Sequence, residues 1–439
     1  MAAASRAPDA LVVGDIEAAR LTCTALGRHG ARTQHLLRPS DGELRAALAT
    51  GVDAVAILVR GDVSALRYAL LVAHLRPGVR LMVTMFDRTL GEELQRAVPT
   101  CTVTSPADIA VPAVIGACLG QEELAVYGHA GAARAVRDTA EGPVVVERPA
   151  QPRSLRRFAL SARSQLRPQD DASRILLGGL LGLAVILVAD WLLGILFLHE
   201  TVVGSLYGAS RVVATVGPGA DEEGSPQWYL VVSSLLMLAA IALAAVFTAG
   251  VVNRLLSRRT IALVGRRTLP LEDHVVVVGL GQVGLRLAAT LRSLDVPTLV
   301  VEREPIPANL AMAKAARIPV LVGPANEPAV MVRANLARAR ALAAMGSRDL
   351  DNVEVAITAR AVAPATPVVV RAGEDDVIAE TRSLFAIGEV RDVPSLTAAA
   401  VTLALLGRRA DVVYARGTQL CAHEDGVEVP VALGPRCRC

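Results

Sequence analysis

The stretch His274–Gly284 reads HVVVVGLGQVG and sets the expected fold of the second half of the chain. Its four consecutive valines predict a short buried strand. Three glycines, at 279, 281 and 284, follow at once, and Leu285–Leu294 has helical spacing. A second apolar run, Thr298–Glu302, ends in a carboxylate. Strand, glycine turn, helix and strand in this order predict a Rossmann-like α/β domain.

Each part of this glycine turn has a chemical use. The first glycine makes the tight turn, the second lets a pyrophosphate approach, and the third allows close packing of helix on strand. The free amides of the helix N-terminus attract phosphate, and Glu302 can accept hydrogen bonds from ribose hydroxyls. We predict a cofactor site formed by Gly279, Leu280, Gly281, Gln282, Val283, Gly284, Glu302 and Arg303. The predicted cofactor is NAD or NADH, with ATP or ADP as alternatives; a tight turn without a ligand is the other interpretation.

Two long apolar segments precede this domain. Residues 175–198, interrupted by Asp190, and residues 228–252 each exceed the ~20 residues that cross a bilayer as a helix. Arginines cluster before the first segment and after the second, whereas the loop between them carries only Arg211. The positive-inside rule therefore predicts a multi-pass protein of the cell membrane, in contact with lipid, with both termini in the cytoplasm. The alternative is a pair of helices buried in a soluble core.

The loop between the segments contains the sequence TVGPG. Residues 204–214 are expected to form a short helix that descends into the membrane, and the chain then returns in extended form. Irregular backbone at membrane depth is tolerated where it is buried in protein or lines a water-filled path, and rings of carbonyls select cations in this way. The predicted ion pathway is Thr215, Val216, Gly217, Pro218 and Gly219, with K⁺ on the carbonyls as the permeant ion. As a bare pentapeptide, TVGPG favours an ordinary Gly-Pro turn; its place between two spans favours the pore-type loop.

Residues 205–221 resemble the pore helix and selectivity filter of the two-transmembrane potassium channels. That resemblance implies a homo-tetramer, because one loop supplies only one quarter of the carbonyl ring. Three features depart from the pattern: Pro218 replaces the usual aromatic residue, the acidic residue Asp221 comes one position late, and Arg211 places a cation in the pore helix. Asp190 is expected at a similar depth, and an ionisable residue inside a span usually has a partner. We therefore predict that Asp190 and Arg211 form a buried ion pair behind the filter.

The domain after the second span resembles the RCK, or Trk-type, regulatory domains that gate potassium channels and transporters. The resemblance covers residues 274–393. Besides the glycine turn it includes VGPA at 322–325, AAMG at 343–346 followed by Asp351-Asn352, and VVVRA at 368–372. It implies an NAD-binding domain that regulates ion transport. Pro324 stands where the family usually has an acid, which weakens one expected ligand contact.

The N-terminal segment reads as a second, degenerate copy of this domain. Residues 10–14, ALVVG, predict a strand and turn, and the runs 54–59 and 81–86 predict later strands of the same sheet. Ile16 and Ala19 replace the second and third glycines, and Leu36, Leu37 and Arg38 stand where the acid is expected. A bulky Ile16 blocks phosphate, so this copy is predicted to bind no dinucleotide and to serve assembly.

These features divide the chain into six parts. Two α/β Rossmann-like RCK domains flank an all-α two-helix transmembrane pore module with a re-entrant loop. The expected limits are 1–148 for the degenerate domain, 149–173 for a basic linker, 174–253 for the pore module with its pore helix and filter at 204–219, 254–272 for a linker, 273–393 for the RCK NAD-binding domain, and 394–439 for a C-terminal RCK subdomain.

Composition narrows the function. A net charge of +3 on 439 residues gives no indication of nucleic-acid binding. The six cysteines form no CxxC pair, and Cys437 and Cys439 alone make an incomplete metal site. The prediction is a potassium or other monovalent cation channel or transport protein, gated by nucleotide, that is not an enzyme. The alternatives are a non-conducting membrane-anchored NAD(H) sensor and an NAD-dependent oxidoreductase, for which no clustered catalytic residues are found.

Overall fold

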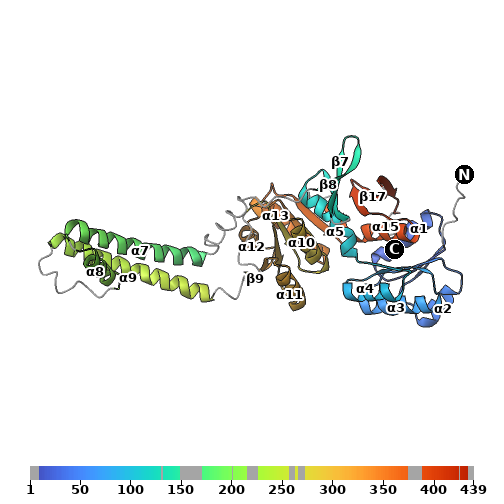
Figure 1. Cartoon of the computed structure of the whole chain (residues 1–439), viewed down its shortest axis with the longest axis horizontal. Coiled ribbons are helices and arrows are strands. Elements are labelled where there is room, and N and C mark those ends of the chain that lie inside the picture. Colours follow the sequence, from blue (N-terminus) through green and yellow to red (C-terminus); the bar gives the residue numbers. More distant parts are fainter. Residues whose placement is uncertain are drawn as a thin grey trace. The chain divides into compact units, whose positions relative to one another are not determined.

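The computed structural model describes residues 9–129, 132–148, 171–199, 201–214, 226–256, 263–264, 272–373, 388–424 and 426–433. The chain divides into two compact units (Figure 1). One unit joins Met1–Ser164 to Leu263–Cys439, and the other comprises Gln165–Ala262. The first unit thus combines the two ends of the chain, and the second contains the apolar segments.

The N-terminal α/β domain is built on a five-stranded parallel sheet in the order β2-β1-β3-β4-β5. Buried apolar side chains line β1 and β3 completely, which explains why these short runs lie in the middle of the sheet. The strands are β1 (Ala10–Val13), β2 (Thr33–Leu36), β3 (Ala54–Ile57), β4 (Arg80–Thr84) and β5 (Cys101–Thr104), and the helices are α1 (Glu17–Arg28), α2 (Asp41–Leu48), α3 (Asp62–Leu75) and α4 (Arg88–Ala97).

The C-terminal α/β domain has a seven-stranded sheet in the order β15-β14-β13-β10-β11-β12-β9, parallel except at β9. Its strands are β9 (Leu263–Val264), β10 (Val275–Val278), β11 (Thr298–Glu302), β12 (Val320–Val322), β13 (Ala341–Ala344), β14 (Val368–Ala372) and β15 (Glu389–Asp392). Its helices are α10 (Gln282–Ser293), α11 (Pro307–Ala315), α12 (Pro328–Arg333), the 3-10 helix η3 (Leu336–Arg338) and α13 (Asp349–Val362). The expected Rossmann-like α/β domains with parallel sheets are confirmed.

The same succession closes both domains. Each parallel sheet is followed by an apolar helix, α5 (Pro106–Leu119) or α15 (Val393–Leu405), and then by a three-stranded antiparallel sheet. These small sheets are β6 (Glu123–His129), β7 (Ala132–Thr139) and β8 (Gly142–Arg148), and β16 (Val412–Arg416), β17 (Gln419–Glu424) and β18 (Val427–Val431). Within the described residues the N-terminal sheet lacks counterparts of β12 and β9, the two strands at one edge of the C-terminal sheet.

The two apolar helices are exchanged between the domains. Val111 and Val114 of α5 are buried with Val275 and Leu287 of the C-terminal domain, whereas Val401 of α15 is buried in the core of the N-terminal domain. Figure 1 shows α15 beside α1 and α5 beside α10. Each domain therefore completes its core with a helix that follows the other domain's sheet.

The second unit contains three helices, α7 (Asp171–Phe197), α8 (Val202–Val213) and α9 (Gln227–Leu256). By length and composition, Gly178–Phe197 and Gln227–Val252 can each cross a membrane, and only 17% and 11% of their apolar windows are buried in the structure. A Cβ on Gly179 would lie 3.0 Å from Phe247, so small residues let α7 and α9 pack closely. These exposed apolar surfaces are typical of helices that face lipid rather than a soluble core.

Candidate functional site

The glycine turn of the C-terminal domain has the backbone geometry that its sequence predicts. Gly279 follows β10 with φ +101°, a conformation that L side chains rarely adopt. A Cβ on Gly284 would lie 2.0 Å from the carbonyl oxygen of Gly279, so only glycine lets α10 pack this closely on the turn. Gly281 differs, because it has φ −75° and a Cβ there would meet nothing within 4 Å. The middle glycine therefore borders open space at the helix N-terminus.

The side chains of the predicted site divide into buried and open groups. Leu280 and Val283 are buried in the core, so they present only their backbone to the turn. Gln282 is exposed at the first position of α10, where the unbonded amides of the helix begin. The turn thus presents its backbone to open space at Gly281, beside the first amides of α10, an arrangement that suits an anion at a helix N-terminus.

Glu302 lies at the end of β11 and reaches the glycine turn. Its Oε2 atom accepts a hydrogen bond of 2.6 Å from the amide of Leu280, and its Oε1 atom accepts one of 3.2 Å from the amide of Glu304. Asn309 donates to the carbonyl of Leu280 at 2.8 Å from the other side. Arg303 is exposed and donates to Asn326 at 3.4 Å. The structure therefore brings Glu302 and the turn together, and leaves Arg303 at the rim.

A neighbouring loop also supports the turn, and the sequence did not identify it as part of the site. Gly346 follows β13, and its amide lies 3.1 Å from the position of a Cβ on Gly279. Asn352 holds this loop, because its Oδ1 accepts from the Gly346 amide at 2.8 Å while its Nδ2 donates to the carbonyls of Gly346 and Arg371, each at 3.1 Å. The glycine before the Asp351-Asn352 pair was the only local signal of this clamp.

The corresponding turn in the N-terminal domain is occupied by its own side chains. The sheet registers pair Val13 with Leu36 and Val278 with Val301, so Leu37 stands where Glu302 stands. Arg38 binds Asp15 of the turn at 2.5 Å, and Ile16 precedes α1 at the place of Gly281. That this copy binds no dinucleotide stays a prediction. Its physical reason is that Leu37 replaces the acid and that Ile16 replaces the glycine that borders open space.

A pair of carboxylates shows that the two domains share more than the strand order. Asp349 begins α13, and its two oxygens accept from the amide of Gly373 after β14 at 2.9 and 3.1 Å. Asp62 begins α3 and accepts from the amides of Phe86 and Asp87 after β4 at 3.0 and 2.8 Å. In both domains a helix that follows one strand thus fixes the loop that follows the next strand.

The predicted ion pathway, Thr215 to Gly219, lies outside the described residues. The helix expected before it is present as α8, which is tied to α7 by a bond from Ser205 to the carbonyl of Trp191 at 2.6 Å and by one from Trp191 to the carbonyl of Val202 at 3.1 Å. Asp190 is buried on α7, and Arg211 lies in the last turn of α8 with its guanidinium over the Tyr207 ring. The ion pair between Asp190 and Arg211 stays a prediction.

The cysteines of the described residues are not poised for chemistry. Burial raises the pKa of Cys23, Cys101, Cys118 and Cys421 to about 12, so these thiols stay protonated and weakly nucleophilic at neutral pH. No group of three or more His, Cys, Asp or Glu residues with metal-binding geometry occurs among the described residues. Cys437 and Cys439 lie outside them.

Comparison with known proteins identifies the class of the C-terminal α/β domain. Residues 275–387 match the TrkA-N domain family. A stretch of 113 residues is 30% identical to the putative K(+) efflux antiporter KefB of Alkalimonas amylolytica. This stretch covers 26% of the present chain and 17% of that protein. The structure titled GsuK Channel superimposes with a TM-score of 0.50 at 14% identity, over 92% of this chain and 64% of that chain. A structure titled GsuK channel bound to NAD matches 58% of this chain and 48% of that chain at 19% identity, with a TM-score of 0.30.

The C-terminal α/β domain is thus a TrkA-N domain, in which the glycine turn and Glu302 stand at the carboxyl ends of β10 and β11. The chain spans less than a fifth of the curated relative and about two thirds of the GsuK channel chain. The family match covers residues 275–387 alone, and the broader structural match, at 14% identity, concerns the fold.

Proposed function

We propose that this chain is a subunit of a membrane protein that transports potassium or another monovalent cation, regulated by a nucleotide bound to its TrkA-N domain. One observation carries this proposal: the same chain contains both a nucleotide-type turn and two exposed apolar helices. The turn is open at its middle glycine and has an acid where a ribose would bind, and the two helices expose most of their surface. The relative and the solved structure named above are, by their names, a potassium antiporter and a channel. In our proposal both spans lie in the cell membrane, with both termini in the cytoplasm.

The ligand that fits the turn best is a nucleotide with an unmodified ribose. The carboxylate of Glu302 favours hydroxyl groups and repels a 2′-phosphate, and the helix N-terminus beside Gly281 favours a phosphate or pyrophosphate. We therefore propose NAD or NADH, with ADP or ATP as the second choice. No step of chemistry is assigned to the nucleotide, and the protein is proposed not to be an enzyme.

Regulation requires that the nucleotide bind two states of the assembly with different affinity. In the proposed homo-tetramer, four loops at 215–219 would form a carbonyl ring for K⁺, and ligand binding would shift the cytoplasmic domains between two arrangements. The second candidate is a nucleotide sensor that does not conduct ions. It is motivated by Pro218, which replaces the usual aromatic residue of the filter, and by Arg211, whose positive charge in the pore helix would repel a cation.

Flux of rubidium into liposomes that contain the purified full chain tests the proposal. We expect uptake that changes when NADH is added, and we expect this change to disappear in Gly281→Ala while basal uptake remains. Binding of NADH without any uptake would favour the sensor instead. Consumption of NADH with a carbonyl substrate would contradict both and favour an oxidoreductase.

A further inference from the structure

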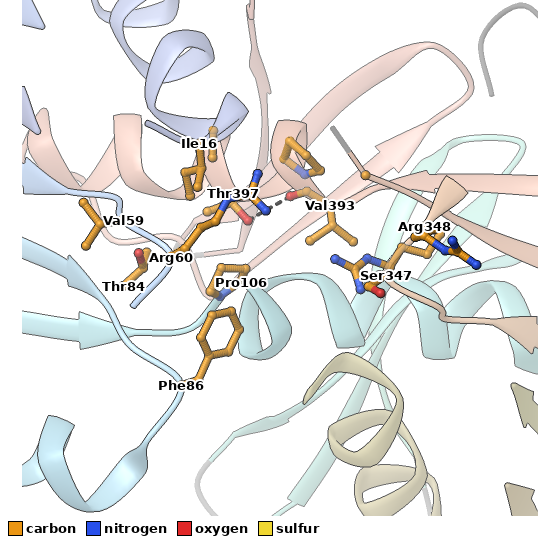
Figure 2. A pocket seen from close by; sticks show the side chains of 14 residues that line it. Ile16, Val59, Arg60, Thr84, Phe86, Pro106, Ser347, Arg348, Val393 and Thr397 are labelled. Atoms are coloured by element: carbon orange, nitrogen blue, oxygen red, sulfur yellow. Dashed lines mark hydrogen bonds between the residues drawn. The ribbon is translucent and has the colours of Figure 1, made fainter. Parts of the chain in front are cut away.

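A cavity of about 550 Å³ lies inside the first unit, between the carboxyl ends of its two parallel sheets (Figure 2). Both α/β domains contribute to its walls. Arg60, Thr84 and Phe86 come from the N-terminal domain, and Ser347, Arg348 and Arg371 come from the TrkA-N domain. Residues Gly279 to Gly284 do not line it; the cavity adjoins the glycine-turn site through Ser347 and Arg348, which follow Gly346.

Equivalent loops of the two domains form the two sides of the cavity. Ile57 pairs with Val13 in one sheet and Ala344 pairs with Val278 in the other, so Ile57 and Ala344 are equivalent. Arg60 and Ser347 each lie three residues further along the chain and therefore occupy the same position after β3 and β13. By the same comparison Thr84 corresponds to Arg371 at the ends of β4 and β14. The cavity therefore lies where the duplicated domains face each other.

The cavity wall carries positive charge and no carboxylate. Its lining residues include three arginines and neither Asp nor Glu. Arg348 lies at the rim and is paired with Asp351. The Nε atom of Arg371 is buried without a hydrogen-bond partner, and its Nη1 atom makes only a long bond of 3.4 Å to the carbonyl of Gly346. Burial lowers the pKa of Arg371, and the nearby Asp349 opposes that shift.

The ends of the exchanged helices add to this charge. Pro106, in the first turn of α5, and Pro394, in the first turn of α15, both line the cavity. A helix N-terminus favours an anion, although Ser105 and Asp392 already cap one amide of each helix. Figure 2 shows Arg60 extending toward Thr397 of α15.

One part of the wall is apolar. Phe86, Ile16 and Val59 line it from the N-terminal domain, and Val393 lines it from α15. A ligand that fills the cavity thus meets guanidinium groups together with an aromatic ring and aliphatic side chains. An inorganic anion alone would leave most of that apolar surface without a contact.

We propose that this cavity is a second ligand site, which binds a small organic phosphate through Arg60 and Arg371 and holds its carbon skeleton against Phe86. Guanidinium groups bind phosphate with directed, charge-assisted hydrogen bonds. Because its two walls belong to different domains, an occupied cavity joins the N-terminal domain to the TrkA-N domain. Ligand at this site would stabilise one arrangement of the two domains, independently of the nucleotide at the glycine turn.

Phenyl phosphate is a suitable probe, because it has one phosphate and one ring but no adenine or ribose for the glycine turn to hold. Calorimetric titration of the full chain in detergent is expected to show one phenyl phosphate per chain, with phenol giving no binding at up to roughly 10 mM. Arg60→Gln and Arg371→Gln are each expected to weaken binding by roughly tenfold or more, as the loss of a charged hydrogen bond implies.

Two control variants keep the test specific. Arg67→Gln removes an arginine that is exposed and paired with Asp41 outside the cavity, and it is expected to bind phenyl phosphate as the original chain does. Gly281→Ala is expected to lose NADH binding and to keep phenyl phosphate. Arg60 is exposed, so its variant is expected to fold even if Arg371→Gln does not.

Three results would overturn the proposal. The first is no binding of phenyl phosphate by the original chain, and the second is unchanged affinity in Arg60→Gln. The third is loss of phenyl phosphate binding in Gly281→Ala or full competition by NADH, which would make the cavity an extension of the nucleotide site. None of these results depends on whether the protein transports potassium.

Discussion

A single methyl group, added at two glycines three residues apart, is expected to separate the structural role of the turn from its role in binding. At Gly284 the new Cβ would lie 2.0 Å from the carbonyl oxygen of Gly279, which belongs to the turn itself. Overpacking costs about 1–3 kcal/mol when side chains can adjust, and backbone on both sides places Gly284→Ala at the upper end of that range. At about 4 °C per kcal/mol, the unfolding midpoint of the domain is expected to fall by roughly 10 °C.

At Gly281 the same methyl group meets nothing within 4 Å, and φ is −75°, which alanine adopts freely. Gly281→Ala is therefore expected to be as stable as the original protein, or more stable by up to about 1 kcal/mol because the unfolded chain loses freedom. The methyl group nevertheless occupies the space through which a phosphate would approach. NADH at 100 times its Kd would stabilise the original domain by about 2.7 kcal/mol, and most of this gain is expected to vanish in the variant.

Scanning calorimetry of the full chain in detergent, with and without NADH, measures both effects. The expected pattern is a low midpoint for Gly284→Ala, and a normal midpoint without an NADH shift for Gly281→Ala. A normal midpoint for Gly284→Ala would refute the packing argument. A full NADH shift in Gly281→Ala would refute the assignment of the ligand to this turn.

Three further predictions concern charged and titratable groups. Asp349→Asn and Asp62→Asn are each expected to destabilise their own domain by about 1.5–3 kcal/mol, because both carboxylates accept backbone amides; denaturant titration measures this, and a neutral effect at either site would contradict the equivalence of the two loops. Burial lowers the pKa of His274 from its usual 6.5. Below about pH 6.5 the unfolded chain therefore binds a proton that the folded domain does not, and the free energy of unfolding decreases as the pH is lowered. His274→Gln is expected to flatten that dependence in thermal unfolding between pH 7 and 5, and an unchanged slope would exclude His274 as its source. For the second unit, Asp190→Arg is expected to disrupt assembly on native gels, and Asp190→Arg together with Arg211→Asp is expected to restore it. Equal disruption by the single and the double variant would rule out the ion pair.

Local sequence patterns predicted the parts of the fold that depend on neighbouring residues. Four valines before three glycines gave β10, the turn and α10, because burial and backbone freedom are properties of those residues themselves. The acid at the end of β11 was equally visible, since the distance along the chain from Gly284 to Glu302 is set by one helix and one strand. The apolar segments gave α7 and α9 by length alone.

Contacts between distant residues explain what the sequence did not predict. The sequence did not predict that α5 packs in the core of the C-terminal domain and α15 in the core of the N-terminal domain. The two cores are similar, and both helices are apolar enough to pack in either one. The cavity depends in turn on that exchange, because Arg60 and Arg371 are brought together only when the two sheets face each other. The bonds of Asn352 to the loop after β13 and to the carbonyl of Arg371 on β14 were not predicted either, since a polar residue on a helix does not reveal which backbone groups it contacts.

The exchanged helices give a physical reason why a degenerate copy would be retained. Val111, Val114 and Ile115 of α5 are almost completely buried in the core that contains β10 and α10. Full burial of each such side chain contributes about 1.5–3 kcal/mol, a large share of the stability of a single domain. The N-terminal copy is thus free to lose the second and third glycines of its turn and its acid, because the TrkA-N domain needs the helix α5 of this copy rather than its ligand site. This argument predicts that the TrkA-N domain expressed without residues 1–148 exposes Val283 and Leu287 to solvent and aggregates, and that adding residues 1–148 as a separate chain restores its solubility.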